Sequence, residues 1–289
     1  MMALFSRVLF FAFLFMTSSA SAQIVTGAIA GAIGGAGRGA VDPAEASYLN
    51  PASVAHLQQY YFSAHYHTGN YGVDGDRSNF GVQLADGMQG SVIPGAFSYT
   101  KKLIELPGVS ATIQDFAVTL AGFPMRHVSL GVTGHRAMSS VPAREDTQDN
   151  VHVGLLVIPV PYLGLGFVVN DALNSSDTIP AVLRLNRTYS LGAHVMMTPT
   201  FRLRLDASQP ERQLGYEGRR TDVMGGLETF FTPEWMFRVG SQWQETRDQT
   251  NVTTGLGYRG PRLSFDYTFQ KDVRSEGGAR HLVDLWLPL

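Results

Sequence analysis

From Tyr60 to the carboxyl end, apolar and polar residues alternate along the chain with a period of two. In residues 262–270 the odd-numbered positions are apolar or aromatic and the even-numbered positions are polar. Residues 201–207 and 235–239 follow the same rule with few departures. Because successive side chains of a β-strand point to opposite faces, each such segment predicts a strand with one apolar and one polar face.

Short turns rich in proline and glycine separate these segments. The tightest turns are 124–127, 159–161, 198–200, 232–234 and 259–261, and longer polar loops such as 171–179 and 209–218 lie between them. This alternation of short and long connections is typical of a transmembrane antiparallel β-barrel. We predict an all-β fold of about 14 strands, at roughly 60–68, 76–86, 92–101, 112–123, 127–138, 148–158, 161–170, 185–197, 200–208, 218–231, 234–245, 249–259, 262–271 and 279–287.

Alternation alone does not separate a membrane barrel from a soluble β-sandwich, whose apolar faces would point inward. Strands of about 9–12 residues have the spanning length, and aromatic residues at the strand ends are typical of a membrane interface. After the amino terminus, no apolar run reaches the roughly 18 residues of a spanning helix, so only a closed barrel could cross a membrane. The aromatic residues are Phe123, Tyr162, Phe201, Trp235, Tyr258 and Trp286.

The amino terminus has the features of a secretory signal peptide. Arg7 precedes the apolar run 8–16, and Ala20-Ser21-Ala22 forms a small-residue cleavage site. We expect residues 1–22 to be removed, leaving a chain of about 267 residues that begins at Gln23. The chain contains no cysteine, which excludes a lipoprotein anchor, disulfides and thiolate metal sites.

The charge of the chain gives no support to nucleic-acid binding. Loss of Arg7 with the signal would shift the net charge from −2 to about −3. A nucleic-acid-binding domain normally carries a basic patch or stripe, and this sequence has none.

Residues 23–59 are rich in glycine and lack the strand pattern, so we interpret them as a short helical hatch, or plug, inside the barrel 60–289. Asp42-Pro43 predicts a helix start, with Asp42 as the N-cap. Asn50-Pro51 predicts a break followed by a second short helix. Small residues allow the backbone of a plug to approach a wall closely.

This segment resembles the amino-terminal hatch of the FadL family of long-chain fatty acid transporters and of the related PorV and UPF0164-type outer-membrane proteins. The resemblance rests on about 20 residues, with Gly37-Arg38 at one end and Asn50-Pro51-Ala52 at the other. It implies a barrel of fourteen strands with an internal hatch. This hatch is several residues shorter than the family pattern, Ser53 stands where glycine is usual, and the external loops are short.

The polar faces of the later strands would line the lumen with mixed charges. Pairing across the turn 232–234 places Glu228 opposite Arg238, an expected ion pair. Pairing across 198–200 turns the polar face of residues 202–206 inward beside His194 and Met196. The charges could form a selectivity ring, contacts to the hatch, or a solvated network that stabilises the wall. The expected lumen residues are Arg202, Arg204, Asp206, Glu228, Arg238 and Asp266, the last near Gly255.

Other candidate sites are weaker. His65 and His67 share one strand face but lack a third metal ligand nearby in sequence. Ser129 and His135 also share a face, yet some 20 Å of strand separates them, which is too far for a hydrogen bond. We therefore predict no enzyme, no metal and no cofactor. Pro94-Gly95 in the third strand could mark an opening in the wall or an ordinary turn.

Three functions fit this sequence. The leading hypothesis is passive uptake of a hydrophobic, fatty-acid-like molecule through the outer membrane, with membrane lipids around the barrel. The second is a PorV-like dock for another exported protein. The third is a polar-solute porin, which requires a mobile hatch.

Overall fold

A computed structural model describes residues 26–70, 75–88, 91, 93–106, 109–142, 144–176, 179, 183–211, 220–274 and 278–289. The predicted signal peptide lies outside the described residues. The described chain forms three short helices and fourteen strands. The helices are α2 (Ala28–Ala32), α3 (Ala46–Leu49) and η1 (Pro51–His56), and the strands are β1 (Tyr60–Asn70), β2 (Asp76–Asp86), β3 (Gly95–Leu106), β4 (Val109–Met125), β5 (Val128–Val141), β6 (Arg144–Val160), β7 (Leu163–Asn170), β8 (Thr188–Met196), β9 (Phe201–Pro210), β10 (Asp222–Phe230), β11 (Trp235–Gln244), β12 (Gln249–Arg259), β13 (Ser264–Asp272) and β14 (Ala279–Pro288).

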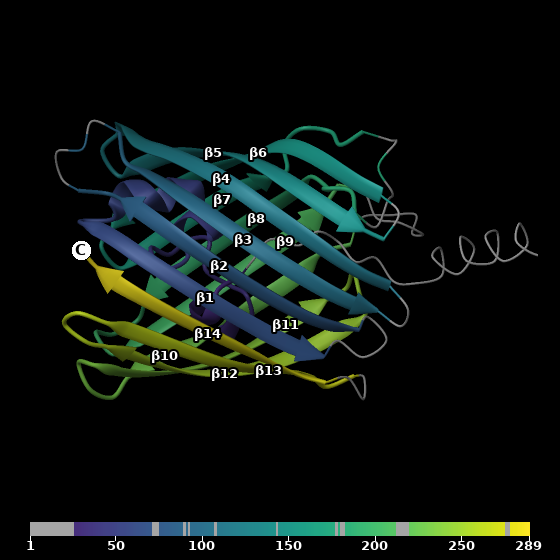
Figure 1. Cartoon of the computed structure of the whole chain (residues 1–289). Helices are drawn as coiled ribbons and strands as arrows, with labels where there is room; N and C mark the ends of the chain where they lie inside the picture. The colour runs from purple at the N-terminus through teal and green to yellow at the C-terminus, as the bar shows by residue number, and fades with distance from the viewer. Residues whose placement is uncertain are drawn as a thin grey trace, which may run out of the picture.

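The strands form one closed antiparallel barrel, as Figure 1 shows. Each strand pairs with its neighbours in sequence, and β14 returns to pair with β1 from Tyr61 opposite Pro288 to Gly69 opposite Arg280. We call this β1–β14 pairing the seam. A closed sheet has no free edge, so its backbone polar groups are satisfied without water. The prediction of a fourteen-stranded barrel is confirmed.

The apolar faces of the strands point outward. In β11 the side chains of Phe237 and Val239 are exposed, whereas Met236 and Arg238 are buried. Neighbouring strands repeat this arrangement on the outer wall. A soluble barrel would have the opposite polarity, so this exterior suits the hydrocarbon of a bilayer.

Five tight turns gather at one end of the barrel together with the carboxyl terminus, and we call this the tight-turn end (Figure 1). Two prolines predicted in turns instead lie in the last residues of their strands. The register of β4 with β5 shifts around Pro124, and that of β6 with β7 shifts around Pro159. Both positions are bulges, which tolerate a residue that cannot donate to the ladder.

Several predictions about the wall are corrected. β8 begins at Thr188 and not at 185, and β10 begins at Asp222, while residues 218–219 of its expected start lie outside the described residues. Pro94 lies just before β3, and β3 pairs continuously with β2 and β4 from Gly95 onward, so the described strand has no break. Trp286 does not face the membrane: its Nε1 donates to Asp266 Oδ2 on the inner side at 3.3 Å.

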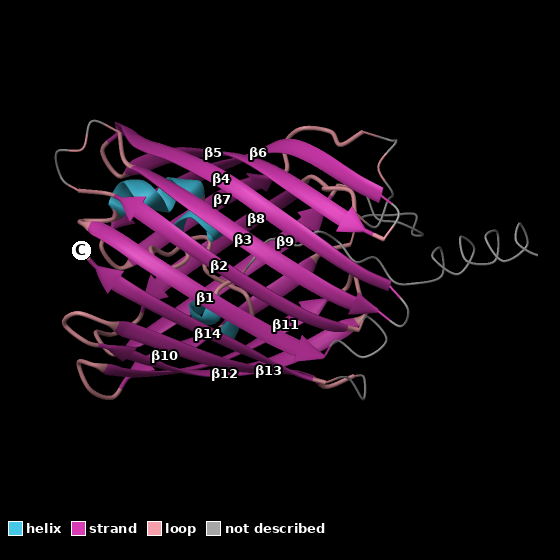
Figure 2. Ribbon diagram, in the orientation of Figure 1, coloured by secondary structure: helices cyan, strands magenta, loops and turns pink. Residues whose placement is uncertain are grey.

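The hatch lies inside the barrel, where Figure 2 shows its helices in cyan. Helix α2 packs against β11–β14, and η1 packs against β3–β6 on the other side. The short helix expected after the break at Asn50-Pro51 is η1, and Asn50 caps it, because its side chain accepts the Ala52 amide. The cap of α3 is Glu45 and not Asp42, which lies in the turn before it.

Among the described residues, no helix is long and apolar enough to cross a membrane.

The outward polarity can be tested at Val239, in the middle of β11. Val239→Arg places a charge where we expect hydrocarbon, so it should destabilise the barrel by about 2–4 kcal/mol in lipid vesicles. Urea-induced unfolding measures this loss. The control is Phe231→Arg, on an exposed residue in a tight turn, where the cost should be about 0–1 kcal/mol. Equal costs at the two positions would contradict a membrane-embedded wall.

Candidate functional site

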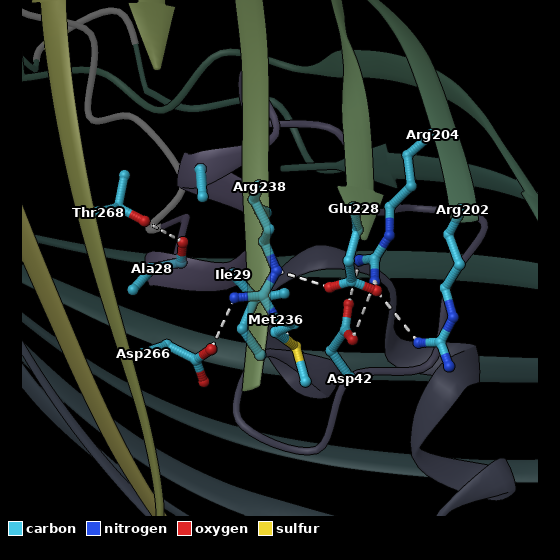
Figure 3. Close-up of polar contacts among 12 residues, drawn as sticks. Ala28, Ile29, Asp42, Arg202, Arg204, Glu228, Met236, Arg238, Asp266 and Thr268 are labelled. Carbon is cyan, nitrogen blue, oxygen red and sulfur yellow. Dashed lines mark hydrogen bonds and ion pairs between the residues drawn. The ribbon is translucent and has the colours of Figure 1, made fainter. Parts of the chain in front are cut away.

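A buried chain of ion pairs crosses the inner wall on β10, β11 and β13 (Figure 3). Arg238 Nε lies 2.6 Å from Glu228 Oε2, and Arg238 Nη1 lies 2.7 Å from Asp266 Oδ1. These three side chains are at most 1% exposed. Arg259 adds a second cation to Asp266 at 2.8 Å. Two acidic side chains therefore hold one arginine that would be very costly to bury alone.

The chain extends to β9 and to the hatch. Glu228 Oε1 accepts from Arg202 Nη1 at 3.1 Å and lies 3.7 Å from Arg204 Nη2. Arg204 forms a two-point ion pair with Asp42 of the hatch. Burial raises the pKa of Asp42, but the adjacent Arg204 outweighs it and lowers the pKa to about 2. Asp42 is therefore ionised, and this pair ties the hatch to the wall.

All six expected lumen residues lie on the inner face of the barrel. Glu228 is paired in register with Arg238, and His194 with Arg204, at the positions expected from the turns. Asp266 pairs directly with Gly257, two residues from the expected Gly255 on the same face of β12, because the turn after β12 extends to Leu263 before β13 begins. These charges are paired and mostly buried rather than solvated, and Arg204 and Asp206 contact the hatch.

Asp206 on β9 binds Gly37-Arg38, the first half of the hatch motif. Its Oδ2 accepts the backbone amides of Gly37 at 2.9 Å and Arg38 at 3.0 Å. The same oxygen also accepts Arg38 Nη1 at 2.9 Å. A single wall carboxylate therefore binds both the backbone and the side chain of this segment, and such charge-assisted bonds are stronger than neutral ones.

Asn50 connects the two halves of the motif. Its Nδ2 donates to Arg38 O at 2.8 Å and to Leu155 O of β6 at 3.1 Å. Its Oδ1 accepts the Ala52 amide at 3.0 Å. Asn50 is completely buried, so loss of this side chain would leave several backbone groups without a partner.

Glycines of the wall face the hatch and let the two backbones meet. A Cβ on Gly166 would lie 2.0 Å from Arg38 O, and one on Gly154 would lie 2.2 Å from Asn50 Oδ1. No side chain can occupy either position without displacing the hatch. The alternation pattern gave no sign of this role, because glycine fits both faces of a strand.

Sequence reasoning also missed the two carboxylates that hold α2. Asp284 Oδ2 accepts the Ala28 amide at 2.7 Å, and Glu45 Oε1 accepts the Ile29 amide at 2.7 Å. Free amides at a helix start need acceptors, and carboxylates suit them electrostatically. Glu45 is only sixteen residues from its partner, but Asp284 comes from the far end of the chain.

Ser129, His65 and His67, the weaker candidates, each contact residues that the sequence did not indicate. Ser129 Oγ lies 3.0 Å from His56 Nε2 of η1, and not near His135. Ser129 is fully buried, so this contact fastens the hatch to β5. His65 and His67 stack at 4.8 Å, and His67 Nε2 lies 3.0 Å from Asp284 Oδ1.

A small cavity of about 80 Å³ lies beside the hatch, between α3 and strands β3–β6. Ser47 and Tyr48 of the hatch line one part of it, and His135, His152 and Asp171 line another. Most of its lining residues are polar. Asn50 and Ala52 are themselves fully buried, so the hatch motif is packed against the wall.

No family model matches the sequence, and no curated protein matches it. Solved structures share its fold. The CymD monoaromatic hydrocarbon channel is 11% identical with a TM-score of 0.73, over 93% of this chain and 99% of that one. The Ralstonia pickettii toluene transporter TbuX is 10% identical with a TM-score of 0.70, over 92% and 99%.

A Pseudomonas aeruginosa FadL homologue is 13% identical with a TM-score of 0.65, over 92% of this chain and 99% of that one. The expected likeness to the FadL-type barrel therefore holds for the fold, along nearly the whole length of each neighbour.

We expect Gly166→Ala to loosen the hatch, because its methyl group would overlap the Arg38 carbonyl. The cost should be about 1–3 kcal/mol, as for other overpacked sites. Faster hydrogen exchange at the Gly37 and Arg38 amides would report it. Gly134→Ala is the matched control, since a Cβ there has no atom within 4 Å. Identical exchange in the two variants would contradict the close contact.

Arg238→Met should destabilise the barrel by about 3–5 kcal/mol, because it leaves Glu228 and Asp266 without their central cation. The midpoint of urea unfolding in detergent micelles measures this loss. Arg136→Met is the control: Arg136 pairs with Asp149 on the exposed surface, so the midpoint should stay unchanged. An unchanged unfolding midpoint for Arg238→Met would show that the barrel does not need the buried network for its stability.

Proposed function

We propose that this chain is an outer-membrane channel for passive uptake of hydrophobic small molecules. In this proposal the signal peptide is cleaved after Ala22, the tight-turn end faces the periplasm, and lipids surround the apolar exterior. The observation that carries the proposal is a FadL-type barrel that holds its own hatch, with Asn50-Pro51-Ala52 at the wall. Its structural neighbours include hydrocarbon channels and a toluene transporter, not enzymes.

The packing of the hatch restricts how such a molecule could pass. The hatch is held by Asp206, Arg204 and Asp284; the contacts of Asp206 and Asp284 are buried, and that of Arg204 with Asp42 is partly buried. Passage therefore requires the hatch to shift. The small cavity beside Tyr48 offers room for the first part of that movement on the β3–β6 side.

The test is uptake of radiolabelled toluene and oleate into proteoliposomes that contain the purified protein. Entry should run down the concentration gradient without added energy, and faster than into empty liposomes. Gly166→Ala, which loosens the hatch, should change the rate, whereas Gly134→Ala should not. Mass spectrometry of apolar molecules that copurify in mild detergent should show a bound ligand. A protein that neither binds nor passes any apolar molecule would contradict the proposal.

A second candidate is a dock for another exported protein, and the buried charge network favours it. Ion pairs join five strands, β9–β13, to one another and to the hatch, so paired charges cover that side of the inner wall. In that case a protein partner should copurify at one-to-one stoichiometry from native membranes. Its absence would count against docking.

A polar-solute porin is distinguished by conductance in a planar bilayer. The transport proposal expects a low conductance for the intact chain and a large increase when residues 23–59 are deleted. A high conductance of the intact chain would favour the porin.

A further inference from the structure

Two histidines and two aspartates meet on the inner wall, away from the ion pairs of β9–β13. His135 is on β5, His152 on β6 and Asp115 on β4, while Asp171 directly follows β7. One potential ligand atom from each of His135, His152 and Asp171 lies within 4.8 Å of the others. Four different parts of the wall therefore contribute to one polar cluster.

The distances inside the cluster are close to those of a metal site. His135 Nε2 lies 3.0 Å from Asp171 Oδ1, and His152 Nδ1 lies 4.0 Å from the same oxygen. Ligands at about 2.0–2.2 Å from a tetrahedral zinc ion are themselves roughly 3.3–3.5 Å apart. A slight widening of the His135–Asp171 distance and a shift of His152 toward Asp171 would bring all three atoms to this spacing.

Asp115 supplies the supporting contact that metal-binding histidines usually have. Its carboxylate lies 3.1 Å from His135 Nδ1, on the side of the ring that faces away from Asp171. This contact places the Nδ1 proton toward Asp115 and leaves the Nε2 lone pair for a cation. The side chains of His135 and Asp171 are only 2% and 6% exposed, so their geometry is fixed by packing.

We propose that His135, His152 and Asp171 form a binding site for a late first-row divalent cation, with zinc the best fit. Two imidazoles and one carboxylate suit Zn²⁺, whereas Mg²⁺ prefers oxygen ligands and keeps its water. All three residues line the cavity of about 80 Å³, which leaves room for water as a fourth ligand. The bound cation replaces the His135–Asp171 contact and the hydrogen bond from the Asp171 amide to His152 Nδ1.

The site would join β5 and β6 to the start of the connection after β7. Asp171 opens that connection, at the end of the barrel opposite the tight turns, with a left-handed backbone at φ 51°. A cation would thus fasten this connection to the wall beside the hatch residue Tyr48. This inference does not depend on which molecule crosses the membrane.

The test uses tag-free protein, stripped with EDTA and exchanged into fresh detergent, and titrates it with Zn²⁺ in a calorimeter. We expect one zinc per chain, with no competition from excess Mg²⁺. X-ray absorption at the zinc edge should show two imidazole nitrogens. Zinc should also raise the thermal unfolding temperature of the wild type, because it binds the folded state.

Variants then assign the ligands. His135→Gln should weaken zinc binding more than a hundredfold, and Asp115→Asn by about 10–100-fold through its effect on His135. His65→Gln is the control, because His65 is a buried histidine of the same lumen that stacks on His67 and lies outside the cluster, so the affinity should stay unchanged. If His135→Gln does not fold, the zinc affinity of His152→Gln is measured instead, and it should fall in the same way.

Two results would overturn the proposal: a wild type that takes up no stoichiometric zinc, or folded His135 and His152 variants that bind zinc as tightly as the wild type. Both results are independent of the uptake assay, so failure of the metal site and failure of the transport proposal would be distinguished.

Discussion

Closure of the β-sheet by the pairing of β1 with β14 is the constraint on which the rest of this structure depends. A bilayer supplies no hydrogen-bond partners, so every backbone group at that depth must find one in the neighbouring strand. Closure at fourteen strands fixes a lumen too wide for wall side chains alone to fill. The lumen must then hold water or a plug, and in this chain the segment before β1 takes that place.

Filling the lumen sets two further requirements, which different residues meet. Close contact requires small residues on both sides, and Gly154 and Gly166 provide them on the wall. Backbone amides and carbonyls of the hatch need partners because they are away from solvent. Asp206 and Asn50 supply several of these partners, and Arg238 is neutralised within the wall by Glu228 and Asp266. The FadL-like motif thus marks the positions where backbone meets wall.

The sequence was sufficient to predict features that depend on residues close together in the chain, such as strand faces and the register across a tight turn. Alternation and turn positions were sufficient to place Glu228 opposite Arg238, because a tight turn fixes the register of the strands it joins. Asp266 pairs with Gly257, two residues from Gly255, because the turn between β12 and β13 is longer than its proline and glycine indicate. The contacts that remained hidden join distant parts of the chain: Asp42 with Arg204, and His135 with Asp171. Neither spacing nor composition contains that information.

The position of Asp284 links the order of assembly to the final structure. It lies on β14, the strand that completes the seam, and it accepts an amide of α2 from 256 residues earlier. Contacts of such high sequence separation form late in folding, because the loop they close is long. The anchoring of α2 by Asp284 therefore depends on the same strand that completes the barrel. Until its last strand is in place, a nascent chain has neither a closed wall nor the carboxylate that holds the start of α2.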